Sequence, residues 1–165
     1  MQDDTSQLSL NDETDYGLCF ACGPLNSAGL QLEFKRLGGV VKTSFLGREE
    51  HQGFPGYVHG GVITAILDEV MSRVALLENK WAITAKLNVR FRKPVSITEP
   101  LTAVAEKTRI VRGFLEAKGQ ISLTNGQVAA DAIGTFSYLS SEALTQMSIQ
   151  YPKLAKEWMR NEPHN

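Results

Sequence analysis

Hydrophobic and polar residues alternate along two early stretches of the chain, as they do in a β-strand that buries one face. In LQLEFKRL, residues 30–37, every second side chain from Leu30 to Phe34 is apolar, which predicts a strand. The glycine pair at 38–39 then predicts a turn, and VVKTSFLG, residues 40–47, predicts a second strand. Two strands joined by a short turn are therefore expected in this part of the chain.

The second half of the chain contains four further stretches that predict strands. The first is AITAKLNVRFRKPV, in which alternation predicts an apolar face and a polar face. The apolar face comprises Ile83, Ala85, Leu87, Val89 and Phe91, and the polar face comprises Thr84, Lys86, Asn88, Arg90 and Arg92. LTAVAEKTRIV, FLEAKGQISL and VAADAIGTFSYL follow as strands, and Asn125-Gly126 before the last one is a strong hairpin signal. Short connections between consecutive strands predict an antiparallel sheet.

One long helix is expected between these two groups of strands, from about Gly60 to Leu77. Apolar residues form a stripe along it and also extend around the rest of the cylinder. The stripe comprises Ile63, Ile66, Leu67, Val70, Val74 and Leu77, and the further apolar residues include Val62, Ala65 and Met71. A helix that is apolar on most sides cannot lie on the outside of a domain, so we expect the sheet to wrap around it. The predicted fold class is α+β.

Composition restricts the organisation of the chain and its partners. The 165 residues, 42% hydrophobic and 21% charged, suffice for one well-packed domain. We expect a polar tail at 1–15, the domain at 16–140 and a C-terminal extension at 141–165, in which Leu154 and Trp158 predict a short helix. The 17 Lys and Arg residues nearly balance the 18 Asp and Glu residues, giving a net charge of −1. This balance argues against nucleic acid or a membrane surface as a partner.

The N-terminal stretch MQDDTSQLSLNDETD is polar and acidic, unlike a secretory signal peptide. No apolar run in the sequence approaches the length that spans a bilayer. The sequence also shows no internal repeat and no low-complexity segment. These features predict a cytoplasmic protein.

Two cysteines, Cys19 and Cys22, have the C-x-x-C spacing. A structural zinc ion needs about four ligands, and the histidines of the chain are not spaced to complete such a set. A redox pair would favour a position at the start of a helix, whereas Gly23 and Pro24 predict a turn. We therefore predict buried or half-buried thiols in a turn, and we expect neither a metal site nor a cofactor.

An acidic pair, Asp68 and Glu69, interrupts the apolar helix. Arg73 follows Glu69 by four positions, in the favourable orientation for an ion pair on a helix surface. Asp68 has only Thr64 and Ser72 one turn away, and a buried unpaired carboxylate costs free energy. Asp68 is therefore either a structural residue bonded to one of these hydroxyls or a carboxylate that acts as a base or a nucleophile.

The helix begins with two glycines, Gly60 and Gly61, after His59. The first N–H groups of a helix have no acceptor within it, so they can stabilise negative charge that develops on a carbonyl oxygen. His59 either caps the helix or reaches the same oxygen.

The spacing of these groups has a consequence for assembly. Gly60 and Asp68 are eight residues apart, which is about 12 Å along a helix and too far for both to reach one carbonyl carbon. If both act in one site, they must come from different subunits. Antiparallel contact of two such helices across a two-fold axis would then create two shared sites per dimer.

These motifs occur together, and in the same order, in one family. CFACG with GLQLEF, GFPGYVHGGVITAILDEVM, TAKLNVRFRKPV and GTFSYL, which together span 18–139, resemble the hot-dog fold acyl-CoA thioesterases of the PaaI-like group in the thioesterase superfamily. The resemblance implies a long central helix wrapped by a curved antiparallel sheet in the domain at 16–140. It also implies dimers whose sheets join edge to edge, and in many relatives a dimer of dimers.

The resemblance assigns roles to individual residues. Asp68 matches the catalytic carboxylate of the family, and Gly60 matches the amide that polarises the thioester carbonyl, with His59 beside it. Thr84 matches the residue that positions the attacking water. Related enzymes have an Asn or Gln six residues before the histidine, where this chain has a glycine, so Gln52 reaches that position only by a one-residue accommodation in the turn.

The resemblance also indicates where the CoA moiety of the substrate binds. Arg90, Arg92 and Lys93 lie on the strand that similar proteins use near the nucleotide. A second basic group, Arg109 and Arg112, precedes Gly113 in the next connection. Arginine and lysine side chains bind phosphate groups, although such residues on a polar strand face are also commonly only solvated.

Hydrolysis of an acyl-CoA thioester to a free acid and CoA is the leading interpretation, with Asp68 acting as base or as nucleophile. The alternative is a non-catalytic acyl-CoA-binding or regulatory protein with the same fold. A hot-dog dehydratase or hydratase is a third interpretation, against which the position of Asp68 speaks. We expect the acyl pocket to form around Val70, Met71, Val74 and Trp81.

Overall fold

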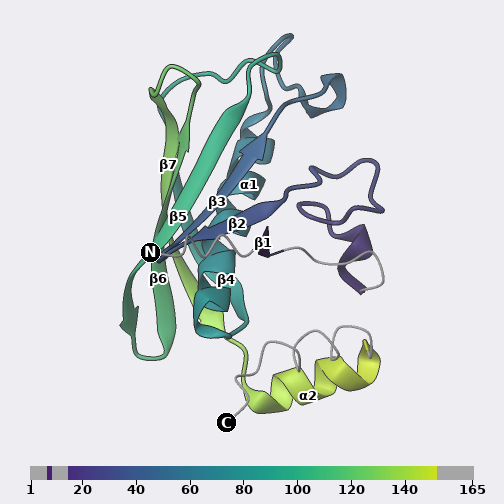
Figure 1. Ribbon diagram of the computed structural model, residues 1–165, viewed down its shortest axis with the longest axis vertical. Helices are drawn as coiled ribbons and strands as arrows, with labels where there is room; N and C mark the ends of the chain where they lie inside the picture. Colours follow the sequence, from purple (N-terminus) through teal and green to yellow (C-terminus); the bar gives the residue numbers. More distant parts are fainter. Residues whose placement is uncertain (1–6, 9–14, 152–165) are drawn as a thin grey trace.

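The computed structural model describes residues 7–8 and 15–151, which form a seven-stranded antiparallel sheet and a central helix (Figure 1). The strands are β1 (Gln7–Leu8), β2 (Phe34–Leu37), β3 (Val40–Phe45), β4 (Ala82–Phe91), β5 (Leu101–Val111), β6 (Phe114–Ser122) and β7 (Val128–Tyr138). Their order in the sheet is β1-β2-β3-β5-β6-β7-β4, which places β4 at an edge. Two helices, α1 (Gly60–Ser72) and α2 (Ser141–Gln150), and three short 3₁₀ segments, Asp15–Leu18, Glu49–His51 and Arg73–Glu78, complete the described elements.

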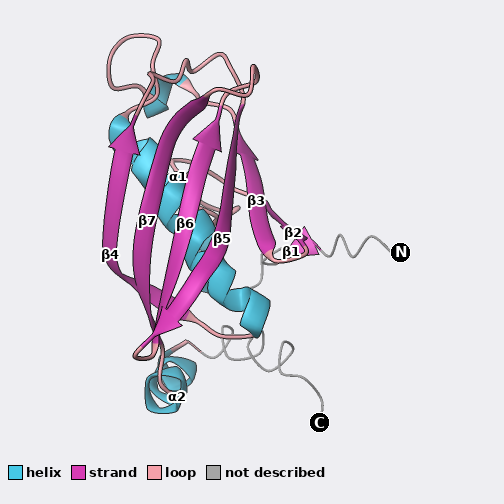
Figure 2. Ribbon diagram, turned by 90° about the vertical axis from the view of Figure 1, so that its left-hand side faces the viewer, coloured by secondary structure: helices cyan, strands magenta, loops and turns pink. Residues whose placement is uncertain are grey.

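Helix α1 lies across one face of the sheet (Figure 2). The strands that pass over it are, in sheet order, β3, β5, β6, β7 and β4. The stripe predicted from the sequence forms the core: Ile63, Ile66, Leu67 and Val70 of α1 and Val74 beyond it are buried. Gly119 of β6 allows this close packing, because a Cβ atom there would lie 2.8 Å from the Met71 side chain. The predicted α+β class and the central position of the helix are confirmed.

Two predicted element boundaries are wrong. The first strand begins at Phe34 rather than Leu30, although Leu30 and Leu32 are buried as their alternation predicted. The α-helix ends at Ser72, and the chain continues to Glu78 as a 3₁₀ helix that Asn79 closes with a φ of 53°. An asparagine tolerates this left-handed conformation, which ends a helix even where the apolar pattern continues.

The predicted faces of β4 are also wrong in part, because a β-bulge interrupts the strand between Thr84 and Lys86. Thr84 pairs with Phe136 and Leu87 pairs with Gly134, and both partners belong to the buried face of β7. Thr84 therefore lies on the helix side of the sheet together with Leu87. One extra residue at a bulge reverses the alternation of all residues before it.

Hairpin turns join the long strands as the sequence predicted. Arg112 and Gly113 connect β5 to β6 with φ angles of 50° and 82°, the left-handed pair that a two-residue hairpin loop requires. Gly126, with a φ of 80°, turns the chain between β6 and β7.

Regular structure occurs near both ends of the described chain. Gln7 and Leu8, within the expected tail, pair with Lys35 and Phe34 of β2. Helix α2 follows β7 directly, with Ser140 as its N-cap, and lies beyond the end of the sheet (Figures 1 and 2). The segment with Leu154 and Trp158 lies outside the described residues. Among the helices of residues 15–151, none has the length and apolar character needed to cross a membrane.

Candidate active site

The start of α1 presents one unused amide. His59 is the N-cap residue, and its Nδ1 accepts a hydrogen bond of 2.8 Å from the Gly61 N–H. The carbonyl of His59 accepts from Val62 and Ile63, while the Gly60 N–H has no acceptor among the described residues. The capping role of His59 is thus confirmed. A neutral imidazole that accepts at Nδ1 carries its proton at Nε2, so His59 keeps one N–H to donate.

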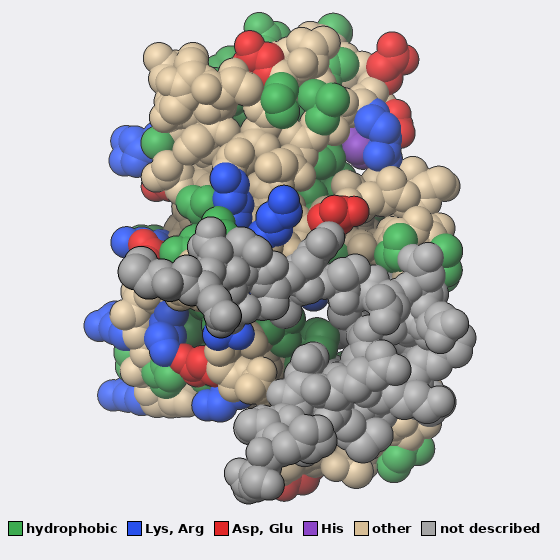
Figure 3. Space-filling view, viewed as in Figure 1, with side chains coloured by type: hydrophobic (Ala, Val, Ile, Leu, Met, Phe, Trp, Pro, Cys, Tyr) green, Lys and Arg blue, Asp and Glu red, His purple; other side chains and the backbone are tan. Residues whose placement is uncertain are grey.

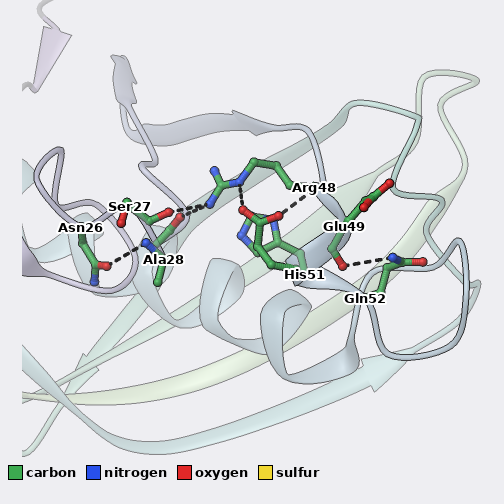
Figure 4. A network of polar contacts seen from close by, with 9 residues as sticks. Asn26, Ser27, Ala28, Arg48, Glu49, His51 and Gln52 are labelled. Atoms are coloured by element: carbon green, nitrogen blue, oxygen red, sulfur yellow. Dashed lines mark hydrogen bonds and ion pairs between the residues drawn. The ribbon is translucent and has the colours of Figure 1, made fainter.

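A network of polar contacts around the buried His51 holds this helix start in place (Figure 4). Arg48 donates from Nη2 to the carbonyls of Ser27 and Gly29, at 3.2 and 2.9 Å. Its backbone N–H donates to Nδ1 of His51, and the His51 carbonyl accepts from the His59 N–H at 2.8 Å. His51 is only 3% exposed, and burial lowers the pKa of its imidazole. The neutral ring therefore acts as a fixed link between the 26–29 loop and α1.

Gln52 is part of the same loop, and its side-chain amide is engaged there. Its Nε2 donates to the Glu49 carbonyl at 3.0 Å, and its Oε1 accepts from the Gly56 N–H. Gly53, which stands where relatives carry an amide, packs against His59: a Cβ atom there would lie 3.0 Å from the ring carbon Cδ2. The close approach of these two residues explains the glycine and leaves Gln52 holding the turn.

Asp68 meets Thr84 across the gap between α1 and β4. The Thr84 hydroxyl donates to Oδ1 of Asp68 at 2.6 Å. Neither helical neighbour competes, because Thr64 donates to the Gly60 carbonyl and Ser72 donates to the Glu69 carbonyl. Burial raises the pKa of Asp68, the Thr84 hydrogen bond lowers it, and the nearby Glu69 raises it again. The carboxylate is thus desolvated, held at one oxygen and free to act at the other.

A hollow opens beside Asp68. Its lining comprises Asp68, Glu69, Ser72, Arg73, Leu76, Trp81, Ala82, Ile83 and Thr84. Trp81 was among the residues expected to form an acyl pocket, whereas Val70, Met71 and Val74 are at most 2% exposed and belong to the core. These three side chains pack in the core and do not line this hollow, so their influence on the depth of an acyl pocket stays a prediction.

A second hollow lies at the other end of α1, beside Gly60. Its lining comprises Val58, Gly60, Ile63, Phe91, Arg92, Lys93, Pro94 and Val95. A Cβ atom on Gly60 would touch the Phe91 ring at 3.5 Å, so the missing side chain keeps the amide open. Sequence reasoning did not identify Phe91 as part of the site, because nothing local predicts that the end of β4 meets the start of α1.

The two hollows lie at separate positions along α1. Helix α1 is continuous from Gly60 to Ser72, so about 12 Å of helix separates Gly60 from Asp68. Within one chain, the open amide and the carboxylate cannot contact the same carbonyl group.

The basic residues expected near CoA fall into two groups at opposite ends of the sheet. Arg92 and Lys93 border the Gly60 hollow, where Arg92 pairs with Asp131 and Lys93 donates to Gln127. Arg109 pairs with Glu116 close to the β5–β6 hairpin. Lys and Arg side chains gather over this hairpin, at the lower left of Figure 3. Exposed ion pairs of this kind are weak and exchange readily for other anions.

Arg90 and Arg112 complete these two groups. Arg90 is an exposed residue of β4, one position before Phe91. Arg112 is exposed in its hairpin beside Gly113. Neither arginine forms an ion pair with any residue in the described part of the chain.

The expected surface ion pair between Glu69 and Arg73 exists but is buried. Arg73 donates to Oε1 of Glu69 from both Nε and Nη2, at 3.0 and 2.8 Å. The arginine is only 4% exposed, because the turn with Cys19 and Cys22 covers it. No local signal in the sequence predicts this burial, since the covering turn lies some fifty residues earlier.

The antiparallel sheet wrapped along one central helix, with its acidic residue at mid-helix, defines a hot-dog fold domain. Residues 55–130 match the model of a family described as the thioesterase superfamily. The matched segment is a little under half of the chain and contains α1, β4 and most of β5 to β7, so this part of the domain is similar to that superfamily. The resemblance stated from the sequence motifs is therefore confirmed.

Individual proteins show the same likeness. Acyl-coenzyme A thioesterase THEM5 of Mus musculus is 31% identical over 97 residues, which cover 58% of this chain and 39% of the relative. A crystal structure of a thioesterase superfamily protein is 30% identical with a TM-score of 0.67, covering 70% of this chain and 61% of the other. The E. coli PaaI protein shares the fold, with a TM-score of 0.63 at 14% identity over 67% of this chain and 81% of its own. The chain thus spans about two fifths of the curated relative.

Proposed function

We propose that this domain hydrolyses an acyl-CoA thioester to a free acid and CoA. The observation that carries the proposal is the Asp68 carboxylate, desolvated beside a hollow and oriented by the Thr84 hydroxyl at 2.6 Å. The likeness to the mouse acyl-coenzyme A thioesterase supports the choice of substrate class. The match of residues 55–130 to the thioesterase superfamily supports the reaction type.

Each half of the site supplies a different part of the reaction. The Gly60 N–H, at the positive end of α1, donates to the thioester carbonyl oxygen and stabilises the charge that develops there. His59, the residue before Gly60, donates to the same oxygen from its Nε2–H. Asp68 either removes a proton from a water molecule that Thr84 helps to orient, or attacks the carbonyl carbon itself. The thiolate of CoA leaves in both routes.

The two routes differ in where the oxygen of the product acid comes from. With Asp68 as base, the new oxygen comes directly from water. With Asp68 as nucleophile, attack on the thioester releases the CoA thiolate and forms a mixed anhydride. In ¹⁸O-labelled water, attack of water on the Asp68 carbonyl carbon of that anhydride then leaves an aspartate oxygen in the product acid and labels Asp68. Mass analysis of the peptide with Asp68 after one turnover distinguishes them.

A dimer brings the two halves together. Strand β4 is an edge of the sheet among the described strands, and its Ile83 is 58% exposed. We propose that two β4 strands pair antiparallel across a two-fold axis, which places α1 of one protomer against α1 of its partner. Gly60 of each protomer then faces Asp68 of the other helix, and the dimer has two shared sites. Further association of two dimers into a tetramer belongs to the same proposal.

The divided basic groups fit this arrangement as a CoA-binding site. The Arg112–Gly113 hairpin lies at the end of the sheet near Thr84, because Phe114 and Ile83 both pair with Ser137. Arg90, Arg92 and Lys93 lie at the opposite end, roughly 25 Å away at 3.3 Å per strand residue. In the proposed dimer, the hairpin near Asp68 of one protomer approaches the basic residues near Gly60 of the other protomer. Both groups then reach the phosphates of one CoA.

The cytoplasmic compartment and the boundaries at 15 and 140 stay predictions from the sequence. The net charge of −1 supports an acyl-CoA partner bound by local charge, without nucleic acid or a membrane.

Replacement of Asp68 by asparagine tests the proposal. The amide is nearly isosteric but can neither accept a proton nor attack a carbonyl, so we expect Asp68→Asn to lower kcat by at least about 10²-fold. Release of free thiol from a panel of short, medium, long and aromatic acyl-CoAs is the measurement. Glu106→Gln is the matched control, because this exposed carboxylate pairs only with Lys118 on the sheet and should leave turnover unchanged.

The outcomes separate the proposal from its alternative. Tight acyl-CoA binding by the wild-type protein without thiol release would favour a binding or regulatory protein. Near-normal turnover of Asp68→Asn would remove Asp68 from the mechanism.

A further inference from the structure

A second polar cluster lies on the side of α1 that faces the N-terminal turn. Its members are Cys19, Cys22, Glu69 and Arg73. One sulfur or oxygen atom from each of Cys19, Cys22 and Glu69 lies within 4.8 Å of the others. The proposed hydrolysis uses none of these side chains, so their arrangement calls for its own explanation.

Arg73 holds a fixed positive charge against the Cys22 thiol. Its Nη2 lies 2.9 Å from Sγ of Cys22, and its guanidinium carbon lies 4.9 Å from the centre of the Phe34 ring. Glu69 fixes the other side of the guanidinium through two hydrogen bonds. Reactive C-x-x-C pairs commonly obtain such a charge from the start of a helix. Here the turn of Cys19 to Gly23 lacks a helix. Arg73 places its charge beside Cys22, where it favours the thiolate that Cys22 must become to resolve a mixed disulfide.

The two thiols differ in exposure and in acidity. Cys22 is buried, at 8% exposure, whereas Cys19 is half-buried. A hydrogen bond from Cys22 lowers the pKa of Cys19 to about 6, against the opposing effect of burial. The same hydrogen bond, together with burial, raises the pKa of Cys22. A reachable thiolate beside a protonated, protected thiol is the arrangement of an attacking and a resolving cysteine.

The same geometry disfavours a metal ion. Zinc in a structural site takes four protein ligands, and the described part of this cluster offers three. The Arg73 guanidinium already contacts both Cys22 and Glu69, so a divalent cation would meet a buried positive charge.

We propose that Cys19 and Cys22 form a dithiol–disulfide redox site that exchanges with low-molecular-weight disulfides of the glutathione type. The Cys19 thiolate attacks one sulfur of the small disulfide, forming a mixed disulfide and releasing one small thiolate that takes up a proton. Cys22 then loses its proton and attacks Sγ of Cys19, which forms the protein disulfide and releases the second small thiol. Two protein thiols are oxidised and one small disulfide is reduced to two thiols.

Equilibration of the full chain with oxidised and reduced glutathione at a series of ratios tests this proposal, with free thiols counted and the mass measured after acid quench. We expect the wild-type protein to lose both thiols together without retaining glutathione. Cys22→Ser removes the resolving thiol, so this variant should stop as a stable glutathione adduct on Cys19. Cys19→Ser leaves only the buried thiol and should react far more slowly.

The pH dependence of alkylation by iodoacetamide is the second measurement. The wild-type rate should rise through a midpoint near pH 6, set by Cys19. Cys22→Ala removes the hydrogen bond to that thiolate, so the midpoint should move upward. This measurement uses the reduced protein and requires no acyl-CoA turnover, so its result is independent of the proposed hydrolysis.

Three results would overturn the proposal. The first is a wild-type protein that keeps both thiols, or accumulates the glutathione adduct, at every ratio. The second is an alkylation midpoint in the ordinary cysteine range for both wild type and Cys22→Ala. The third is binding of one zinc ion per chain by the reduced protein, lost in Cys19→Ser, which would assign the cluster to a metal.

Discussion

The hydroxyl of Thr84 affects the pKa of Asp68 as well as the position of its carboxylate. Burial favours the neutral carboxyl and raises its pKa, whereas the hydrogen bond from Thr84 favours the charged form and lowers it. Both proposed routes need the charged form, because only a carboxylate accepts a proton or attacks a carbonyl. The balance between these two influences therefore determines the lower pH limit of activity.

Thr84→Ala should lower activity in a pH-dependent way. Loss of the hydrogen bond raises the pKa of Asp68 further, so activity, which disappears as the pH falls through this pKa, should disappear at a higher pH than in the wild type. At the pH optimum, the loss of positioning should cost roughly 10- to 100-fold in kcat. A profile of kcat/KM between pH 4 and 9 measures both effects.

Thr84→Ser is the control for this variant. It keeps the hydroxyl that donates to Asp68 and should retain the acidic limb of the wild-type profile. An acidic limb in Thr84→Ala that coincides with the wild type would show that another group limits activity at low pH.

At the scale of elements, the first turn of α1 combines a stabilising cap with an open amide. His59 uses its Nδ1 to cap Gly61 and leaves Gly60 uncapped. The neighbouring glycines therefore have different functions. Gly61 makes room for the imidazole, since a Cβ atom there would lie 2.9 Å from Nδ1. Gly60 leaves open space beside Phe91, where we propose that the thioester carbonyl binds.

Alanine at these two positions should separate stability from activity. Gly60→Ala places its methyl group 3.5 Å from Phe91, an ordinary contact, so the protein should fold and lose at least about tenfold in kcat/KM as the hollow fills. Gly61→Ala displaces His59 and should unfold more easily than Gly60→Ala by about 1 kcal/mol, the usual contribution of an N-cap. Urea denaturation and thiol-release kinetics on both variants provide the comparison. Equal stability of the two would contradict the capping role.

The elements also show where a periodic pattern in the sequence stops being informative. The alternation from Ile83 to Phe91 correctly predicts β4 but assigns Thr84 to the wrong face, because a bulge leaves no mark in hydrophobicity. The apolar stripe of the long helix continues past Ser72, although the backbone tightens to a 3₁₀ helix there. Both irregularities adapt an element to its neighbours, and neighbours distant in the chain are not encoded in a local pattern.

At the scale of the whole molecule, the open amide and the carboxylate of one protomer lie too far apart to contact one carbonyl group. The open amide at Gly60 and the carboxylate of Asp68 border separate hollows at different positions along α1. The exposed edge of β4, with Ile83 and Phe91 each more than half exposed, is the surface that a partner would cover. Assembly is therefore expected to be a condition for activity.

Mixing two variants that each have low activity tests the shared site directly. In a dimer of Asp68→Asn with Gly60→Ala, one of the two sites combines an intact Gly60 with an intact Asp68, and the other site lacks both. Random mixing gives about half mixed dimers, so co-refolded protein should recover roughly a quarter of wild-type activity. Light scattering during size-exclusion chromatography confirms the dimer in each preparation.

The parent variants refolded separately provide the baseline. Activity of the mixture equal to the average of the two parents would show that Gly60 and Asp68 do not act in one shared site. An active protein that light scattering shows to be monomeric would exclude the dimer proposal altogether.

The sequence by itself determined the features that depend on near neighbours in the chain. The strand alternation, the apolar stripe of α1, the hairpin turns and the caps follow from the preferences of residues a few positions apart. The motif around His59 and Asp68 showed the resemblance to the thioesterase superfamily, which the family match over residues 55–130 supports. The rise per residue of an α-helix was enough to predict that Gly60 and Asp68 lie about 12 Å apart.

Only the tertiary structure decided which distant residues meet. It placed Thr84 against Asp68, Phe91 beside Gly60, and Arg73 beneath Cys22. The residues in these contacts are 16 to 51 positions apart in the chain. They meet because both the sheet and the N-terminal turn pack against one helix. Local preferences do not contain this information, since it depends on how complete elements fit together.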